Sequence, residues 1–300
     1  MTRVTRETEA GRAYLDLQNR ARREHRNTQE LLTLYIVERW LARLSKSAHT
    51  EQFVLKGGML LATFDARRPT ADADALARDM ANDEATVIER ILEIASLPDN
   101  DGVEFRTDTV TAHTIRDEAL YAGLRVTMDA RLATATVRFR IDVNFGDPVT
   151  PAPQMINLPT LRPETAPIRI LGYPIETVLA EKITTAITLG DANTRVRDYA
   201  DIYTLISKQQ LHHAAVHEAL LATAEFRGTS LQPLSEVIDE LANLRHQAYV
   251  AYRASLGADG EHLPQVFSTL VETVAAFADQ LIEARPPTAM WLPQELRWRH

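Results

Sequence analysis

Apolar residues repeat with a helical period near the start of the chain. The first such set recurs every four residues and consists of Leu32, Ile36, Trp40 and Leu44. This spacing places its members on one face of a helix. Asn27 and Glu30 precede the set with the spacing of a capping box, which marks the start of that helix. A second amphipathic helix is predicted at 82–97.

The period changes to two between residues 103 and 145. Leu124, Val126 and Met128 alternate with polar residues, and the odd-numbered positions from 137 to 145 are all apolar. Alternation of this kind is typical of strands that bury one face, and it predicts antiparallel strands of one sheet. Three shorter segments also read as strands: 53–55, 71–76 and 168–171.

The second half of the chain reads as helical. Residues 147–167 are rich in proline and predict an irregular connection. Helical periodicity then covers most of 174–285, and an aromatic tail at 286–300 contains Trp291 and Trp298. The fold class predicted from this pattern is α+β, with a mixed or antiparallel sheet, flanking helices and a C-terminal helical domain. The expected domains are a basic N-terminal helical arm at 1–50, an α/β core at 51–172 and a helical domain at 173–300.

Composition is that of an ordinary soluble protein and excludes several kinds of site. The chain has 300 residues, of which 45% are hydrophobic and 25% charged. Because cysteine is absent, disulfides, zinc–thiolate sites, iron–sulfur clusters and cysteine nucleophiles are excluded. No apolar run has membrane-spanning length, and the polar first residues do not read as a secretory signal. We therefore expect a cytoplasmic protein with no membrane partner.

Charge is distributed unevenly along the chain. The net charge is −8, yet residues 1–70 carry 13 Lys and Arg against 8 Asp and Glu, a balance of +5. Residues 71–120 carry 4 against 13, a balance of −9. Arginine is strongly preferred, because only four of the 33 basic residues are lysines. A lysine inside a motif is therefore less expected by chance than an arginine.

Two aspartates follow a glycine pair in the predicted core. Asp72 and Asp74 are separated by one residue, so on a strand they share a face at a spacing of about 7 Å. Two carboxylates this close repel each other unless a cation or a proton lies between them, and oxygen ligands suit Mg²⁺. Gly57 and Gly58 permit close approach of the backbone to another group, for instance a phosphate. The competing interpretation is a solvated edge strand and a simple turn.

Further polar residues recur on predicted regular elements. Asp142 lies on the polar face of a strand, where it would supply a third carboxylate or, alternatively, be an exposed strand residue flanked by arginines. Lys182 lies on a predicted helix, and Asp198 and Asp201 share one face of the next helix. The structural alternative for this second group is a pair of helices joined by ion pairs. No Rossmann, Walker or nucleophile-elbow motif is present.

In this order, the motifs resemble those of the AbiEii nucleotidyltransferase toxins of type IV toxin–antitoxin systems, which belong to the DNA polymerase β-like superfamily. The resemblance spans residues 50–206 and rests on Lys56-Gly57-Gly58-Met59, the run 68–74, Asp142, Glu181-Lys182 and the run 197–203. The chain departs from the superfamily pattern in having Ala73 between the aspartates. It also has Gly57-Gly58 where a Gly-Ser pair is usual, so a serine hydroxyl is missing and Thr70 offers the nearest replacement.

The resemblance implies transfer of a nucleotide from an NTP to an acceptor, with release of pyrophosphate. Family relatives, including mycobacterial tRNA-modifying toxins, add pyrimidine nucleotides to the 3′ end of tRNA and so block aminoacylation. CTP or another pyrimidine NTP, a tRNA or other RNA acceptor and a cognate antitoxin encoded nearby are therefore the expected partners. Mg²⁺ or Mn²⁺ is the expected cofactor.

The same resemblance assigns roles to individual residues. Asp72 and Asp74 would bridge two metal ions, and Asp142 would hold the ion on the acceptor side. Lys182 would neutralise the triphosphate. Asp198 would orient Lys182 or Arg197, or contact the nucleotide. The expected nucleotide-binding residues are Gly57, Gly58, Thr70 and Lys182.

Two further points stay open from the sequence. The weaker candidates for RNA contact are six arginines: Arg20, Arg22, Arg23, Arg26, Arg138 and Arg140.

The alternative activities are nucleotidylation of a protein or of a small-molecule hydroxyl. A non-catalytic module that binds RNA or a protein partner is the remaining alternative.

Overall fold

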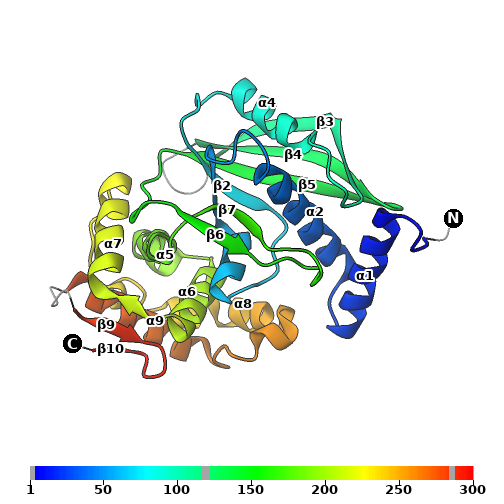
Figure 1. Cartoon of the computed structure of the whole chain (residues 1–300). Helices are drawn as coiled ribbons and strands as arrows, with labels where there is room; N and C mark the ends of the chain where they lie inside the picture. Colours follow the sequence, from blue (N-terminus) through cyan, green and yellow to red (C-terminus); the bar gives the residue numbers. More distant parts are fainter. Residues whose placement is uncertain (1–3, 117–121, 284–287, 300) are drawn as a thin grey trace. The chain divides into compact units, whose positions relative to one another are not determined.

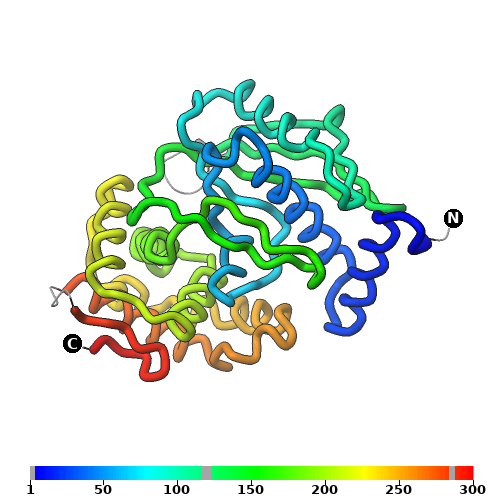
Figure 2. Tube along the Cα trace, viewed as in Figure 1, coloured from blue at the N-terminus to red at the C-terminus, as the bar shows by residue number. Residues whose placement is uncertain are grey.

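The computed structural model describes residues 4–116, 122–283 and 288–299 (Figure 1). The chain divides into two compact units, and Figure 2 traces its course. Unit 1 comprises Met1–Thr63, Pro69–Gly146 and Gln154–Gly172. Unit 2 comprises Phe64–Arg68, Asp147–Pro153 and Tyr173–His300. Each unit is described on its own below.

Unit 1 is built on a seven-stranded sheet in the order β3-β4-β5-β2-β1-β7-β6. The strands are β1 (Phe53–Lys56), β2 (Ala73–Ala77), β3 (Val103–Arg116), β4 (Ala122–Leu132), β5 (Ala135–Phe145), β6 (Gln154–Leu158) and β7 (Ile168–Gly172). β2 is parallel to β5 and β1 is parallel to β7, whereas the other neighbouring strands are antiparallel. The mixed sheet of the predicted α+β fold is thereby confirmed.

The helical elements of unit 1 among the described residues are α1 (Glu9–Arg23), α2 (Thr28–Leu44), α3 (Gly57–Leu60), η1 (Leu61–Phe64, whose last residue belongs to unit 2) and α4 (Glu84–Ala95). α2 begins where the sequence indicates, because the Asn27 side chain accepts a hydrogen bond from the Gln29 amide. The cap departs from the predicted box, because Asn27 bonds the amide of Gln29 and not that of Glu30, and the Glu30 carboxylate pairs with Arg26.

α2 is buried along almost its whole length and forms the centre of unit 1. The Trp40 ring contacts Phe53 and Phe139, with ring centroids 6.0 and 5.5 Å apart. Arg43 donates to both oxygens of Asp101, at 2.6 and 3.1 Å, so a buried ion pair also fixes the helix. The predicted N-terminal arm therefore contains a helix that belongs to the core of the same unit as the sheet.

Alternation along β5 separates the two faces of this sheet. The odd-numbered residues 137–143 are buried on the side that packs against α2. The even-numbered residues therefore lie on the opposite face, and these are Arg138, Arg140, Asp142 and Asn144. The polar face of the sheet carries the chemistry described in the next subsection.

Unit 2 is mainly helical and also contains a small sheet. Its elements are α5 (Ile175–Leu189), η2 (Gly190–Ala192), α6 (Val196–Lys208), β8 (Leu211–His212), α7 (His213–Arg227), η3 (Leu234–Glu236), α8 (Leu241–Ser255), η4 (Gly257–Gly260), α9 (Phe267–Ile282), β9 (Met290–Leu292) and β10 (Arg297–Arg299). The expectation of an all-helical second half is wrong in this respect, because β8, β9 and β10 pair as a three-stranded sheet.

The aromatic tail completes the core of unit 2. Trp291 and Trp298 are buried, and their ring centroids lie 4.8 and 5.3 Å from that of Phe277 on α9. The Trp291 indole donates a hydrogen bond to the Ile206 carbonyl at 2.7 Å. The expected start of the tail at Pro286 and Pro287 lies outside the described residues.

Two other local expectations need correction. The proline-rich connection contains the strand β6, which pairs with β7 and was not predicted. β2 begins at Ala73 rather than residue 71, so Asp72 immediately precedes the strand. A proline-rich composition hides short edge strands, because proline is tolerated there.

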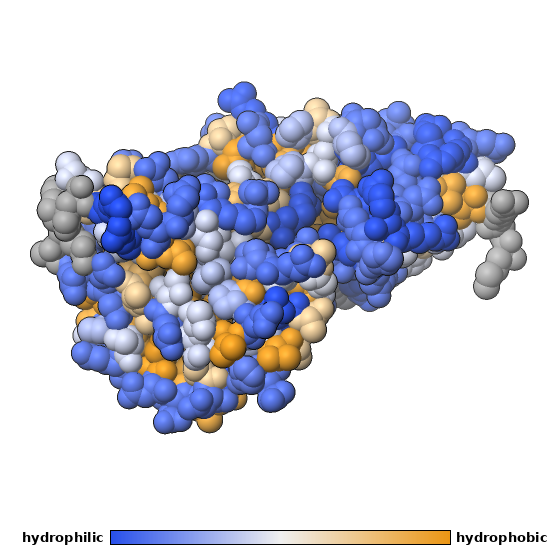
Figure 3. Space-filling model, turned by 90° about the horizontal axis from the view of Figure 1, so that it is seen from below, coloured by the Kyte–Doolittle hydropathy of each residue, from blue (hydrophilic) through white to orange (hydrophobic). Residues whose placement is uncertain are grey.

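Hydrophobic residues at the surface are dispersed. On the face drawn in Figure 3, they lie in small separate patches among hydrophilic ones. None of the described helices is both long and apolar enough to cross a bilayer.

Candidate active site

Two of the predicted metal ligands lie side by side on the polar face of the unit 1 sheet. Asp74 on β2 is the register partner of Asp142 on β5, and the two strands are parallel. Asp74 is also the register partner of Lys56 on β1. The Asp142 residue is only 8% exposed, whereas Asp72 and Asp74 are half-buried. The sheet therefore brings together three residues that are far apart in the sequence.

The glycine pair lies directly against one of these carboxylates. Gly57 has φ +65°, and a β-carbon built on it would lie 2.0 Å from the Asp74 Oδ2 atom. Only glycine accommodates this approach in a left-handed backbone conformation. The group that the Gly57 backbone approaches is thus a carboxylate of the candidate site. Its predicted role in phosphate binding, and that of Gly58, stay predictions.

Thr70 is engaged with the first aspartate of the motif. Its hydroxyl donates a hydrogen bond to Asp72 Oδ1 at 3.0 Å. This contact holds the Asp72 side chain just before β2 begins. The predicted contact of Thr70 with a nucleotide would require the hydroxyl to exchange this partner or to serve both groups.

The third carboxylate, that of Asp142, is paired with an arginine that was not among the predicted site residues. Arg125 on β4 is the register partner of Asp142 and donates to both of its oxygens, at 2.7 and 2.6 Å. The hydrogen bonds to Asp142 raise the pKa of Arg125 against the effect of burial, and the charges of Asp142, Asp72 and Asp74 add to the increase. The Arg125 guanidinium therefore experiences the negative charge of all three aspartates.

The donor set of this site suits a hard divalent cation. Asp72, Asp74 and Asp142 supply carboxylate oxygens, which are the ligands that Mg²⁺ and Mn²⁺ prefer. Within the described residues, no three His, Asp or Glu side chains are already arranged around a common point that could hold a metal ion. Both oxygens of Asp142 accept hydrogen bonds from Arg125.

Unit 2 contains the second group of predicted residues as a buried ion network. Lys182 on α5 donates to Asp198 Oδ1 at 2.5 Å and to Asp201 Oδ2 at 2.9 Å, both on α6. Arg68 donates to the other oxygen of Asp201 at 2.8 Å. Arg195 lies 2.9 Å from Asp198 Oδ2. These cations and carboxylates therefore share one network, in which Lys182 bonds both Asp198 and Asp201.

Charge pairing dominates the ionisation of this network. Burial disfavours the Lys182 ammonium, but the charges of Asp198 and Asp201 outweigh burial and raise its pKa. Burial likewise disfavours the Asp198 carboxylate, but Lys182 and Arg195 outweigh it and lower its pKa to about 2. Lys182 is therefore a permanently charged ammonium at physiological pH rather than a proton acceptor.

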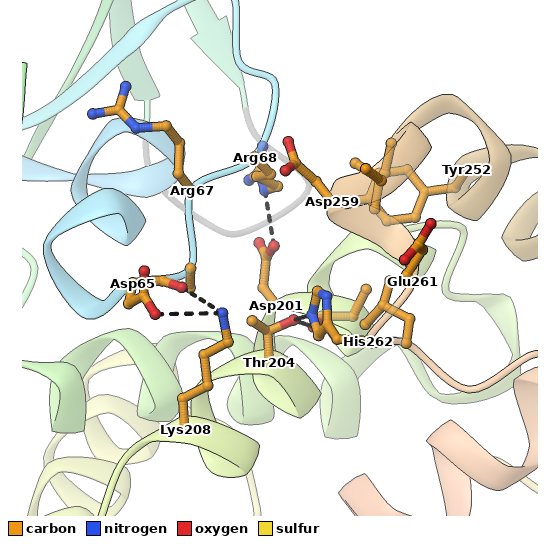
Figure 4. A pocket seen from close by; sticks show the side chains of 15 residues that line it. Asp65, Arg67, Arg68, Asp201, Thr204, Lys208, Tyr252, Asp259, Glu261 and His262 are labelled. Carbon is orange, nitrogen blue, oxygen red and sulfur yellow. Dashed lines mark hydrogen bonds and ion pairs between the residues drawn. The ribbon is translucent and has the colours of Figure 1, made fainter. Parts of the chain in front are cut away.

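A pocket of about 400 Å³ within unit 2 borders the same network. Arg68 and Asp201 line it, and Figure 4 shows the Arg68 side chain pointing toward Asp201. Across the pocket, Thr204 Oγ1 and His262 Nε2 are hydrogen-bonded at 2.8 Å. Lys182 thus bonds one oxygen of Asp201, and Arg68 in the wall of the pocket bonds the other.

The six candidate arginines for RNA contact differ in solvent exposure and in ion pairing. Arg20 and Arg26 are half-buried and pair with Glu24 and Glu30. Arg22 and Arg23 are exposed at the end of α1, where Arg23 lies 3.9 Å from Glu24. Arg138 is exposed and pairs with Asp129 at 3.1 Å. Arg140 is half-buried, and its Nε has no hydrogen-bond partner among the described residues. A role in RNA binding stays a prediction for all six.

Sequence reasoning missed Arg125, and it did not connect Arg68 of the run 68–74 with the Lys182 network. Arg125 alternates with the buried Leu124 and Val126, so its place on the polar face could have been found. Its partner depends on the register of β4 against β5, which alternation alone does not determine.

One family model covers most of the chain, including the residues of both clusters. The model of the family described as nucleotidyl transferase AbiEii toxin, type IV TA system, matches residues 39–280. The chain belongs to this family. It is thus assigned to the nucleotidyltransferase toxins of type IV toxin–antitoxin systems, and membership implies a cognate antitoxin. A search of the curated proteins finds no match.

Two solved structures from Helicobacter pylori are similar to the AbiEii-family chain. The structure of JHP933 has 14% sequence identity and a TM-score of 0.52, and the match covers 85% of this chain and 93% of JHP933. A second structure, provisionally described as a nucleotidyltransferase, has 14% identity and a TM-score of 0.49, with 86% of this chain and all of that chain covered. At this identity the likeness to JHP933 supports the fold alone.

Proposed function

We propose that this toxin transfers a nucleoside monophosphate from an NTP, such as CTP or another pyrimidine NTP, to an RNA hydroxyl. The 3′ end of tRNA is the acceptor we propose first, and its modification would block aminoacylation and translation. In this reaction the acceptor oxygen forms a bond to the α-phosphorus and pyrophosphate leaves with the electrons of the broken P–O bond. This places the activity among the nucleotidyltransferases of EC class 2.7.7.

The observation that carries the proposal is the registered pair Asp74–Asp142 with Gly57 packed against Asp74. Asp72 and Asp74 would hold two Mg²⁺ or Mn²⁺ ions, and Asp142 would hold the ion on the acceptor side. When bound, such ions stabilise the attacking and leaving oxygens of an in-line displacement. Carboxylates aligned across two adjacent parallel strands are suited to this, because the sheet fixes their spacing.

The family resemblance also implies that Lys182 neutralises the triphosphate and that Asp198 serves catalysis through it. The buried network supports the charge state that this role needs, since Asp198 and Asp201 keep the ammonium protonated. The structure describes this group within unit 2 only, and the role itself stays a prediction.

A labelling experiment tests the proposal. The purified protein is incubated with Mg²⁺ and each α-labelled NTP in turn, together with total tRNA or with total cell protein, and the RNA 3′ ends are sequenced. Label at tRNA 3′ ends, dependent on Asp74, supports the proposal. Label in protein or in a small molecule instead would establish one of the alternative acceptors, and absence of transfer would favour a binding module.

A further inference from the structure

The contact of interest is the pair that Arg125 and Asp142 form across β4 and β5. Arg125 donates to both oxygens of Asp142, at 2.7 and 2.6 Å, and its side chain is 30% exposed. Asp142 is 8% exposed, so its carboxylate has little contact with solvent beside this ion pair. A planar guanidinium in bidentate contact donates one hydrogen bond to each carboxylate oxygen.

A metal ion and Arg125 require the same oxygens. A divalent cation held by Asp142 needs at least one of the oxygens that Arg125 now occupies. A guanidinium beside a dication is also repelled by it. Arg125 has solvent on one side and can therefore withdraw, whereas Asp142 is fixed in the buried strand.

We propose that Arg125 is a positioning residue that occupies Asp142 in the metal-free protein and releases it when the divalent cation binds. Cation affinity is then set by competition with the guanidinium. The pair has a second effect in the metal-free state, because it offsets the mutual repulsion of the three aspartates. This inference rests on the metal site of the proposed function.

The chain contains a matched control for this pair. Arg138 and Asp129 form a second cross-strand Arg–Asp pair between the same two strands, in the mirrored sense, at 3.1 Å. Arg138→Gln removes the same charge and a more exposed ion pair between the same strands without freeing a predicted metal ligand. Any effect of net charge is therefore common to both variants.

The test measures Mn²⁺ affinity by calorimetry for the full chain and its variants. Arg125→Gln should tighten Mn²⁺ binding about five- to tenfold, the effect of one half-buried ion pair. Arg138→Gln should change it by less than about twofold. In an Asp142→Asn background the effect of Arg125→Gln should shrink to the size of the control. Arg125→Lys keeps a positive charge but loses the bidentate geometry, so it should tighten binding by an intermediate factor.

The rise in melting temperature on adding Mn²⁺ gives a second readout that a purely structural role would not change. Metal-free Arg125→Gln should melt at a lower temperature than the wild type, and added Mn²⁺ should raise its melting temperature by more than it raises that of the wild type. If Arg125→Gln does not fold, Arg125→Lys carries both measurements.

The possible outcomes separate the two proposals. If the wild type binds Mn²⁺ and the Arg125 variants bind it equally or more weakly, the competition is overturned. The proposed function then still stands. An equal gain in Mn²⁺ affinity in the wild-type and Asp142→Asn backgrounds also overturns the competition, because the effect would then come from net charge alone. Absence of Mn²⁺ binding in the wild type and in every variant overturns both.

Discussion

Gly57 and Asp74 are so close that no side chain larger than hydrogen fits between them. A β-carbon on Gly57 would lie 2.0 Å from Asp74 Oδ2 and 2.6 Å from its Cγ. The positive φ of Gly57 adds a backbone penalty for any other residue. The glycine of the motif therefore sets the position of a carboxylate.

Gly57→Ala should push the Asp74 carboxylate out of place and abolish nucleotide transfer. The left-handed backbone adds about 1 kcal/mol of destabilisation. Gly228→Ala is the control, because Gly228 has φ +62° with no atom within 4 Å of its virtual β-carbon. Gly57→Ala should lose more stability than Gly228→Ala in denaturant unfolding, because the clash with Asp74 adds to the backbone penalty that both share, and only Gly57→Ala should lose transfer. Equal transfer in the two variants would contradict the role of this close approach.

Asp72→Asn should reduce transfer by roughly a hundredfold or more, since a metal-bridging carboxylate is removed. The amide oxygen can still accept the Thr70 hydrogen bond, and one source of repulsion disappears. The melting temperature without metal should therefore stay equal or rise. Asp79→Asn, at an exposed position shortly after β2, should change neither quantity. A large drop in metal-free stability in Asp72→Asn would show that the residue is structural.

Lys182→Ala should impair both turnover and folding. The substitution leaves two buried carboxylates short of a cation, which typically costs about 3–5 kcal/mol. Lys182→Arg should recover part of each, because a guanidinium keeps the charge but differs in shape from an ammonium. Comparing turnover at equal folded fraction separates the two effects. Unchanged turnover in Lys182→Ala would remove this residue from the catalytic set.

The depressed pKa of Asp198 predicts how acid acts on unit 2. Its folded-state pKa is about 2 against an ordinary value of 3.8, so its stabilising contribution is complete above pH 3.8 and is lost as pH falls toward 2. The stability difference between wild type and Asp198→Asn should therefore shrink by about 1 kcal/mol between pH 5 and pH 3. Denaturant unfolding at both pH values measures it, and a constant difference would contradict the depressed pKa.

RNA binding by the first helix can be tested on its two exposed arginines. Arg22→Gln combined with Arg23→Gln should weaken tRNA binding and flatten its log–log salt dependence by about 0.7–0.9 for each phosphate that the variant no longer binds. Arg20→Gln should have a smaller effect, because the half-buried Arg20 donates to both Glu24 and the Leu161 carbonyl. NTP affinity should be unchanged in both. Identical salt slopes for the wild type and the double variant would exclude α1 from the RNA surface.

The fold class could be predicted because the periodicities of helices and strands are strong and local. The alternation that places Asp142 on a polar strand face needs no tertiary information, and neither does the four-residue spacing of Leu32 and Ile36. The start of α2 at Asn27 is also readable from adjacent residues, and the hydrogen bond from the Gln29 amide confirms it.

The parts that could not be predicted depend on pairing between distant segments. The pairing of Arg125 with Asp142 follows from the register of β4 against β5, and a shift of one residue would place Arg125 on the other face. The strands β8 and β9 are two and three residues long, too short to produce a period of their own. They form because the tail returns to pair with a segment far earlier in the chain, where Trp291 is the partner of Leu211.

Only part of the ion network of Lys182 could be predicted from the sequence. The helical spacing of Asp198 and Asp201 correctly places both on one face, where each bonds Lys182. Arg68 precedes Asp201 by 133 positions, and no local pattern connects the two.

The three tryptophans are distributed so that each unit carries its own optical reporter. Trp40 is buried in unit 1, whereas Trp291 and Trp298 are buried in unit 2. A Trp40→Phe variant would therefore emit from unit 2 alone, and the double variant Trp291→Phe/Trp298→Phe from unit 1 alone. Fluorescence of the two variants during denaturant titration would show whether the units unfold in one cooperative step or one after the other.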